Sequence, residues 1–259
     1  MTNYFSTDEQ RQWFDDVKRL VEETYVTNNN QQVTFIAHSY GVSMTMIFFR
    51  QQTEIWKNKY IARMISLAGS YGGTAIVLKV YAQGDRIGEV PASHLRNEQI
   101  SQPALAYLLP FPIFWSDNEV LVTSKSRNYT RSQYREFFED LGFPTAYEYR
   151  KDNLRFVDDF SAPNVKIHCL YGLGFDTVAE LDYKSDDLSE LPNIIYGNGD
   201  GTINERSLKG CSFWKKSQKK LINVHEIPNA EHSEILSNNQ TLSYIVDLLV
   251  NQNLNTERD

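Results

Sequence analysis

A serine stands between small residues where a strand-forming segment gives way to a helical one. Residues 33–36 are β-branched or aromatic, Ser39 follows them, and residues 42–50 form a largely apolar helical segment. Ala37 and Gly41 complete the pattern G-x-S-x-G, with alanine in place of the first glycine. In such a turn the backbone is strained, the hydroxyl projects from the carboxyl edge of a sheet, and small residues let strand and helix approach closely. The pattern predicts that Ser39 is a nucleophile; the alternative is an ordinary serine in a strand-to-helix turn.

A nucleophilic serine needs a base within hydrogen-bond reach, and histidine is the usual one. The chain has five histidines. His38 adjoins the serine and is expected to support the turn, whereas His94 lies in an irregular region. His168 and His225 fall inside predicted strands. Because His232 lies in a loop just after the last predicted strand, it is favoured as the base over the alternative of a solvated loop histidine.

The acid that would orient this base has two candidates. Asp176 follows a predicted strand at 163–172, and Asp200 lies between Gly199 and Gly201. In α/β-hydrolases the three groups follow in the order serine, acid, histidine, each on a loop after a strand. Both aspartates satisfy that order, and position alone slightly favours Asp176.

The elements that must hold these residues alternate between helix and strand. Strands are predicted at 33–36, 60–68, 163–172 and 221–227, and amphipathic helices before the first strand, at 42–50, at 129–141 and after His232. A strand, a helix and a second strand around the serine indicate a parallel crossover. The sequence therefore predicts an α/β fold with a parallel sheet and helices on both of its faces.

The alternating pattern breaks down between residues 82 and 162, where prolines recur. We expect residues 1–81 and 163–259 to form the core and residues 82–162 to form a cap or lid insertion. Within the insertion, residues 104–115 are strongly apolar and aromatic. This segment is expected either to contact acyl chains as part of a lid or to pack the insertion onto the core.

Composition narrows the range of partners. The chain of 259 residues carries a formal charge of −7 and has no basic tract, which argues against nucleic acid and against purely electrostatic docking on anionic membranes. Small molecules or lipids are the expected partners. No apolar run is long enough to span a membrane, and the first residues do not form a signal peptide. Two tripeptides, at 128–130 and 239–241, match the glycosylation sequon. The two cysteines are consistent with one disulfide or with two free thiols.

Four motifs along the chain together resemble the lecithin:cholesterol acyltransferase family, and within it most closely the lysosomal (group XV) phospholipase A2 branch. The similarity extends over almost the whole chain. The motifs are Ala37-His38-Ser39-Tyr40-Gly41, His168-Cys169-Leu170-Tyr171-Gly172, Gly199-Asp200-Gly201-Thr202-Ile203 and Glu231-His232-Ser233-Glu234.

The resemblance implies an α/β-hydrolase fold and a triad of Ser39, Asp200 and His232, so that Asp176 becomes a turn residue. The backbone N–H of Tyr40 would be the first oxyanion donor. The implied reaction is calcium-independent: the serine takes an acyl group from a glycerophospholipid, and water or a lipid alcohol accepts it, with no metal or cofactor. The family is lysosomal or secreted and acts at lipid surfaces.

Two further expectations come from comparing the chain with that family. Cys211 matches a family cysteine that is disulfide-bonded, and Cys169 is the one partner available to it. The nucleophile strand is normally the fifth in the family, yet 38 residues precede Ser39 here. We therefore expect an N-terminally truncated sheet, no second oxyanion donor, and weak activity or none from this chain alone. The alternative function is that of a truncated, weakly active or inactive family member that keeps the fold or binds lipid.

Overall fold

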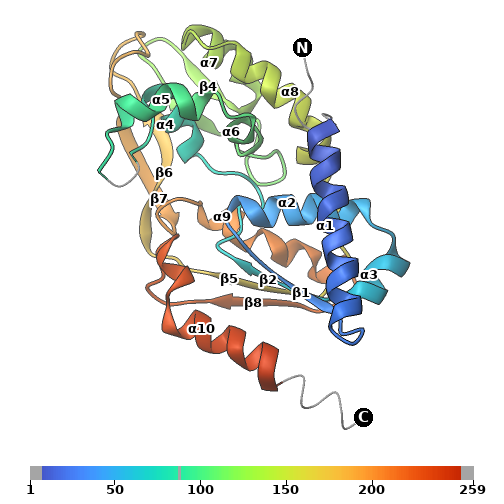
Figure 1. Cartoon of the computed structure of the whole chain (residues 1–259). Helices are drawn as coiled ribbons and strands as arrows, with labels where there is room; N and C mark the ends of the chain where they lie inside the picture. Colours follow the sequence, from blue (N-terminus) through green and yellow to red (C-terminus); the bar gives the residue numbers. More distant parts are fainter. Residues whose placement is uncertain (1–7, 87–88, 252–259) are drawn as a thin grey trace.

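Two four-stranded sheets organise the chain (Figure 1). The computed structural model describes residues 8–86 and 89–251, so the expectation about a signal peptide lies outside the described residues. The first sheet is parallel throughout and has the strand order β1-β2-β5-β8. Its strands are β1 (Val33–His38), β2 (Ile61–Leu67), β5 (Ile167–Tyr171) and β8 (Ile222–Glu226). All four strands predicted from the sequence are confirmed, with ends displaced by a few residues.

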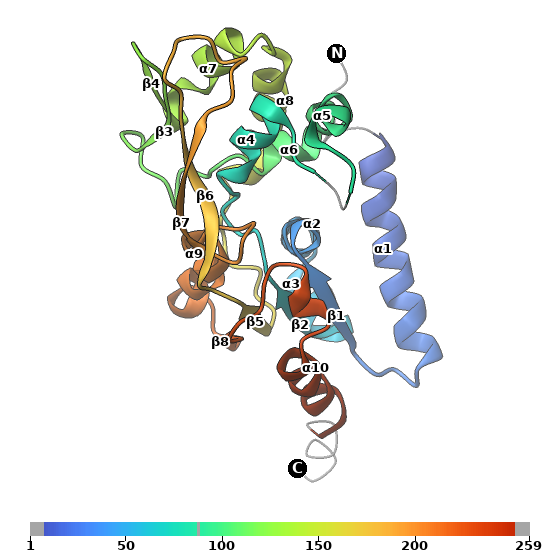
Figure 2. The same cartoon turned by 90° about the vertical axis from the view of Figure 1, so that its left-hand side faces the viewer.

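Helices cover both faces of this parallel sheet, as predicted. On one face α2 (Tyr40–Gln51) buries Val42, Met46 and Phe49, which recur at helical spacing, against the strands. On the other face lies α10 (Asn239–Val246) (Figure 1). Its Tyr244 and Ile245 pack against the apolar cluster that includes Ile65, Leu67 and Leu170 of the strands. The helix α1 (Asp8–Thr27) runs along the β1 side of the sheet, and α3 (Glu54–Tyr60) leads into β2 (Figure 2). The fold is that of an α/β-hydrolase.

The second sheet lies above the first and has the order β4-β3-β6-β7 (Figure 2). Its strands are β3 (Val120–Thr123), β4 (Asn128–Thr130), β6 (Phe175–Asp182) and β7 (Asn193–Gly199). The strands β6 and β7 form an antiparallel hairpin, and β6 also pairs in parallel with β3. The division of the chain into a core and an insertion at 82–162 remains a prediction. The pairing ties the hairpin, which lies outside that range, to strands inside it.

Short helices surround the second sheet. They are α4 (Ile76–Gln83), α5 (Ala92–Ile100), α6 (Pro103–Tyr107), α7 (Tyr134–Asp140), α8 (Thr145–Val157) and, near the join to the first sheet, α9 (Glu205–Leu208). Irregular helical turns span Arg131–Gln133, Lys209–Lys216, Glu234–Leu236 and Asp247–Asn251. The helix predicted over 129–141 forms only in its second half. Its first residues pair as β4, and Thr130 then begins a 3₁₀ turn through a capping box with Gln133.

The apolar segment 104–115 divides between the two expected roles. Leu109, Phe111 and Trp115 are fully buried and pack the segment into the core. Leu105 and Leu108 instead line a cavity next to Ser39. The segment therefore both anchors the upper layer and contributes a wall to the site.

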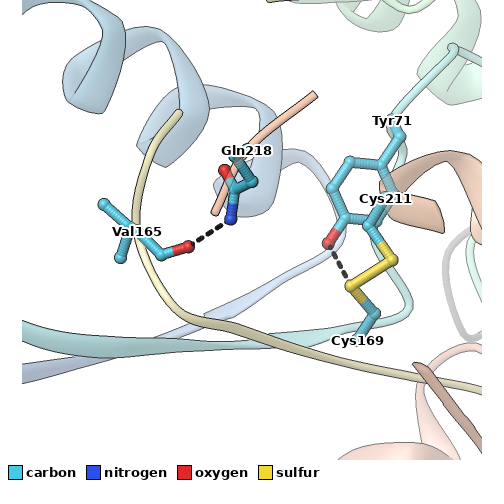
Figure 3. The surroundings of a disulfide bond; sticks show 5 residues. All are labelled: Tyr71, Val165, Cys169, Cys211 and Gln218. Atoms are coloured by element: carbon cyan, nitrogen blue, oxygen red, sulfur yellow. Dashed lines mark hydrogen bonds between the residues drawn. A yellow bond between two sulfur atoms is a disulfide. The ribbon is translucent and has the colours of Figure 1, made fainter. Parts of the chain in front are cut away.

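A disulfide joins the parallel sheet to the segment that precedes β8. Cys169 of β5 is bonded to Cys211, and both are buried (Figure 3). The Tyr71 hydroxyl donates to the Cys169 sulfur at 3.4 Å, and the Gln218 amide donates to the Val165 carbonyl at 2.8 Å (Figure 3). Of the two alternatives left by the cysteine count, the structure contains the disulfide.

Removing this disulfide should destabilise the chain strongly. The bond closes a loop between residues 42 positions apart, and the entropy of that loop in the unfolded chain corresponds to about 4 kcal/mol. We expect the Cys169→Ala/Cys211→Ala double variant to lose roughly that much free energy of unfolding in a urea titration. Reductant should lower the midpoint of the wild type and leave that of the double variant unchanged. Equal wild-type midpoints with and without reductant would contradict the prediction.

A buried histidine under α10 should make folding sensitive to acid. His168 is 4% exposed, its Nδ1 lies 2.8 Å from the Tyr244 hydroxyl, and Asn223 donates to the same hydroxyl at 2.8 Å. The Tyr244 O–H therefore donates to Nδ1, which favours neutral imidazole. Burial, together with nearby Arg63 and Lys166, lowers the pKa of His168 from 6.5 to about 4.

The consequence for stability has a definite sign. Between pH 6.5 and 4 the unfolded chain binds a proton at His168 that the folded chain does not, so the stability contributed at neutral pH is lost as pH falls through this window. The loss amounts to roughly 3 kcal/mol. We expect urea midpoints of His168→Asn to fall less steeply between pH 7 and 4 than those of wild type. The control is His94→Asn, at an exposed position on α5. Parallel pH profiles for wild type and His168→Asn would refute the assignment.

Candidate active site

The turn at Ser39 has the strained conformation that the sequence predicts. Ser39 joins β1 to α2 with φ 55° and ψ −126°, in the left-handed region that non-glycine residues rarely occupy. Its backbone N–H donates to the Leu67 carbonyl at 3.0 Å, and its carbonyl accepts from Val42 at 3.0 Å. These bonds tie the strained turn to the end of β2 and to the first turn of α2. The expected crowding at Gly41 is not seen, because an added Cβ would meet no atom of the described residues within 4 Å.

The candidate base meets the serine directly. His232 lies in the loop after β8, and its Nε2 is 2.9 Å from the Ser39 Oγ. The side chain is nearly buried, since His232 is 7% exposed. With Nδ1 protonated, Nε2 can accept the serine hydroxyl hydrogen, which is the arrangement that a general base requires.

The candidate acid is completely buried and fully hydrogen-bonded. Asp200 directly follows β7, is 0% exposed, and places Oδ2 2.8 Å from the His232 Nδ1. Its Oδ1 accepts the backbone N–H groups of Thr202 at 3.0 Å and Ile203 at 2.7 Å. These donors compensate the carboxylate for its loss of water, so it can remain charged inside the protein. The carboxylate fixes the proton on Nδ1 and leaves Nε2 free to act on the serine.

The other candidates lie elsewhere. Asp176 is exposed on β6, where it pairs with Asn198 across the hairpin. His94 is exposed on α5, His225 is exposed on β8, and His168 is buried against Tyr244. The structure thus brings together the serine, the acid and the base that the family resemblance implies. The aspartate that position alone had favoured, Asp176, lies beside the Asp200 segment in the hairpin but is exposed, whereas Asp200 is buried and bonds to His232.

A glycine that sequence reasoning did not assign to the site shapes the base loop. Gly172 ends the segment after β5, and a Cβ built on it would lie 1.7 Å from the Ala230 carbonyl oxygen. Ala230 lies two residues before His232. The base loop therefore crosses directly over the Gly172 backbone, and only glycine leaves it room. The sequence shows a glycine at the end of the predicted strand, at position 172. It does not show that Ala230 would lie against that glycine in the fold.

The serine opens onto an apolar cavity of about 360 Å³. Side chains of α4 and α6 form its wall, and Ser39 and Tyr40 form part of its lining. Polar side chains that include the exposed Glu98 and Gln102 mark its open side. The apolar wall comprises Ile76, Val77, Val80, Ala104, Leu105 and Leu108. A cavity of this size and character accommodates an extended hydrocarbon chain.

The residue after the serine is well placed to bind negative charge. Tyr40 is the first residue of α2, so its backbone N–H has no acceptor within that helix and lies at the positive end of the helix dipole. Its ring packs edge-on against Tyr107 with 5.8 Å between ring centroids, and burial raises the pKa of its hydroxyl. The ring therefore stays neutral, and Tyr40 lines the cavity together with Ser39.

The fold and this arrangement define an α/β-hydrolase. Comparison with known sequences then gives the family. The sequence profile described as "Lecithin:cholesterol acyltransferase" matches residues 4–160 and 156–239, and the chain belongs to that family.

Relatives within this family are moderately similar. The chain is 36% identical over 240 residues to a lysosomal phospholipase A and acyltransferase of Homo sapiens, covering 92% of this chain and 58% of that protein. It is 33% identical over 238 residues to a phosphatidylcholine-sterol acyltransferase of Gallus gallus, covering 91% and 57%. The chain thus spans less than two thirds of the length of these relatives. Among solved structures, a chain of the Tle4-Tli4 complex shares the fold, with a TM-score of 0.54, 13% identity, and coverage of 89% of this chain and 64% of that one.

Proposed function

We propose that this chain is a serine acyl hydrolase and O-acyltransferase that acts on glycerophospholipids. The observation that carries the proposal is the continuous hydrogen-bonded series from Ser39 through His232 to Asp200, placed at an apolar cavity. Membership of the lecithin:cholesterol acyltransferase family supports the same reaction class.

The proposed reaction proceeds through an acyl-enzyme. The Ser39 Oγ attacks the ester carbonyl carbon while its proton passes to the His232 Nε2, and the Tyr40 N–H donates to the oxyanion. As the intermediate collapses, the leaving alcohol oxygen takes the proton from His232. Water or a lipid alcohol then gives its proton to the same nitrogen and attacks the acyl-enzyme carbonyl. As this second intermediate collapses, the bond to the Ser39 Oγ breaks and Oγ takes the proton back from His232. Asp200 stabilises the imidazolium at both stages without itself taking up the proton.

The shape of the cavity supports a fatty acyl substrate. Its wall is aliphatic, and the polar side chains at its open side would lie next to the glycerol and head group of a bound phospholipid. The acyl chain would be held away from water against α4 and α6. A lipid alcohol is proposed as an acceptor beside water because relatives carry the name acyltransferase.

The proposed place of action is a lipid surface in the lysosome or outside the cell. Support comes from the name of the human relative, which includes the word lysosomal, and from the exposure of Asn128 and Asn239 at the two glycosylation sequons. Among residues 8–86 and 89–251, the structure contains no helix with the length and apolar character needed to cross a bilayer.

Incubation with phosphatidylcholine vesicles that contain a long-chain primary alcohol tests the proposed function. We expect free fatty acid, lysophospholipid and the acylated alcohol to appear together, and adding chelator should change none of the rates. The blank is Ser39→Ala. If Ser39→Ala forms product at the wild-type rate, Ser39 is not the nucleophile. If wild type releases fatty acid but forms no acylated alcohol, its activity is hydrolysis alone.

A second candidate is a non-catalytic lipid-binding role. The observation in its favour is that β1 pairs with β2 alone among the described strands and leaves Ile36 51% exposed at the edge of the sheet. Under this alternative the chain would sediment with vesicles while forming no product. Sedimenting the vesicles at the end of the same assay separates the two roles, because bound protein and released acyl groups are then measured in one sample.

A further inference from the structure

His38, the last residue of β1, contacts the loop that carries the base. Its Nε2 lies 2.9 Å from the backbone carbonyl oxygen of His232, which is 194 positions away in the sequence. The two imidazole rings are 4.8 Å apart between centroids. Because a carbonyl oxygen can only accept a hydrogen bond, Nε2 of His38 must carry a hydrogen and donate it.

With this contact, every polar group of His232 has a hydrogen-bond partner. The backbone N–H of His232 donates to the Asp200 carbonyl at 2.9 Å, and its backbone carbonyl accepts from His38. Its two ring nitrogens bind Asp200 and Ser39. All four polar groups of His232 are therefore held, and one of them is held by the strand that also carries the serine. Without His38, the backbone of the base would be tied to the acid alone.

We propose that His38 is a positioning residue that fixes the base loop to the nucleophile strand by donating from Nε2 to the carbonyl of His232. The inference rests on the proposed function of Ser39 and His232. His38 does not line the cavity, so it is not expected to contact the acyl chain. Its removal should slow activation of the serine and leave substrate binding nearly unchanged, because a small displacement of a base can cost far more in rate than in affinity.

Burial favours a neutral donor at His38. It lowers the pKa of His38 below its ordinary value and outweighs the opposing effects of the bond to the His232 carbonyl and of the nearby Asp200 and Glu231 carboxylates. A neutral His38 holds the carbonyl without placing a cation beside a base that must itself take up a proton. This explains why an imidazole suits the position better than a lysine or arginine would.

Two substitutions separate the hydrogen bond from the volume of the side chain. His38→Gln keeps an amide N–H donor of similar reach, and His38→Leu keeps the bulk without a donor. We expect His38→Leu to react with a fluorophosphonate about tenfold more slowly than wild type, and to hydrolyse a soluble short-chain ester with a lower kcat and nearly the same KM. His38→Gln should recover to within about threefold of wild type. His225→Gln, on the far edge strand β8, serves as the unaffected histidine control.

Amide hydrogen exchange gives a readout that does not depend on turnover. The His232 amide, which bonds to Asp200, should exchange faster in His38→Leu than in wild type or His38→Gln, with equal global unfolding midpoints. If wild type fails to react with the fluorophosphonate, the proposed function falls and exchange still decides the positioning role. The inference is overturned if His38→Leu exchanges and reacts like wild type, or if His38→Gln is as impaired as His38→Leu.

Discussion

Replacing Ser39 with alanine is expected to abolish fluorophosphonate labelling and to lower ester hydrolysis by roughly four to six orders of magnitude. The reason is that Ser39 supplies the hydroxyl that bonds to the His232 Nε2, at 2.9 Å. No covalent intermediate can form without it. Labelling followed by intact-mass measurement detects the adduct directly, and peptide mapping locates it.

The matched control for this experiment is Ser132→Ala, which changes an exposed serine on the upper sheet side of the molecule and should label like wild type. An adduct that persists in Ser39→Ala would show that another nucleophile reacts. A folded wild-type chain that takes no label at all would instead favour the lipid-binding alternative.

Introducing a single methyl group at Gly172 should disable the same reaction from a distance. The added Cβ would lie 1.7 Å from the Ala230 carbonyl oxygen, so the backbone of the base loop has to move. The conflict is one of space, since Gly172 is not among the residues with positive φ. A displacement of about 1 Å at a catalytic group typically costs on the order of 100-fold in rate, and we expect at least that loss of labelling rate in Gly172→Ala.

Gly197→Ala provides the comparison. Gly197 lies in β7, and its added Cβ would meet Ala179 at 3.4 Å, an ordinary contact. This variant should label within a few-fold of wild type, so a loss confined to Gly172→Ala identifies the base loop as the cause. If Gly172→Ala and Gly197→Ala label equally fast, the loop that carries His232 can shift to accommodate the added methyl group. The close approach at Gly172 is then not required for activity.

The part of the site that could be predicted from the sequence is the part that depends on local chemistry. A strand followed by a serine between small residues specifies a turn at Ser39, and a histidine after the last strand specifies the position of His232. The choice between Asp176 and Asp200 is not local, because both follow strand-like segments. Both aspartates lie at the same end of the β6–β7 hairpin, so the choice depended on which of the two carboxylates is buried against the base, and the family resemblance supplied that information.

The upper layer was harder to predict, for two physical reasons. The strands of the second sheet are either very short or half exposed, so their patterns lack the continuous apolar runs of the buried parallel strands. The prolines that made residues 82–162 look irregular mostly begin helices: Pro91 and Pro144 precede α5 and α8, and Pro103 is the first residue of α6. Proline is favoured at a helix start, so it marked helices there instead of breaking them.

The β6–β7 hairpin carries one member of the proposed triad into the other sheet. The serine and the base belong to the parallel sheet, whereas Asp200 is carried at the end of β7 in the second sheet. The proposed site therefore lies at the interface between the two layers, and the Asp200 carboxylate is the catalytic group that the upper layer contributes. A movement of the upper layer relative to the lower one would separate Asp200 from His232. Opening of the cavity therefore has to be confined to α4, α5 and α6 if the serine is to stay active.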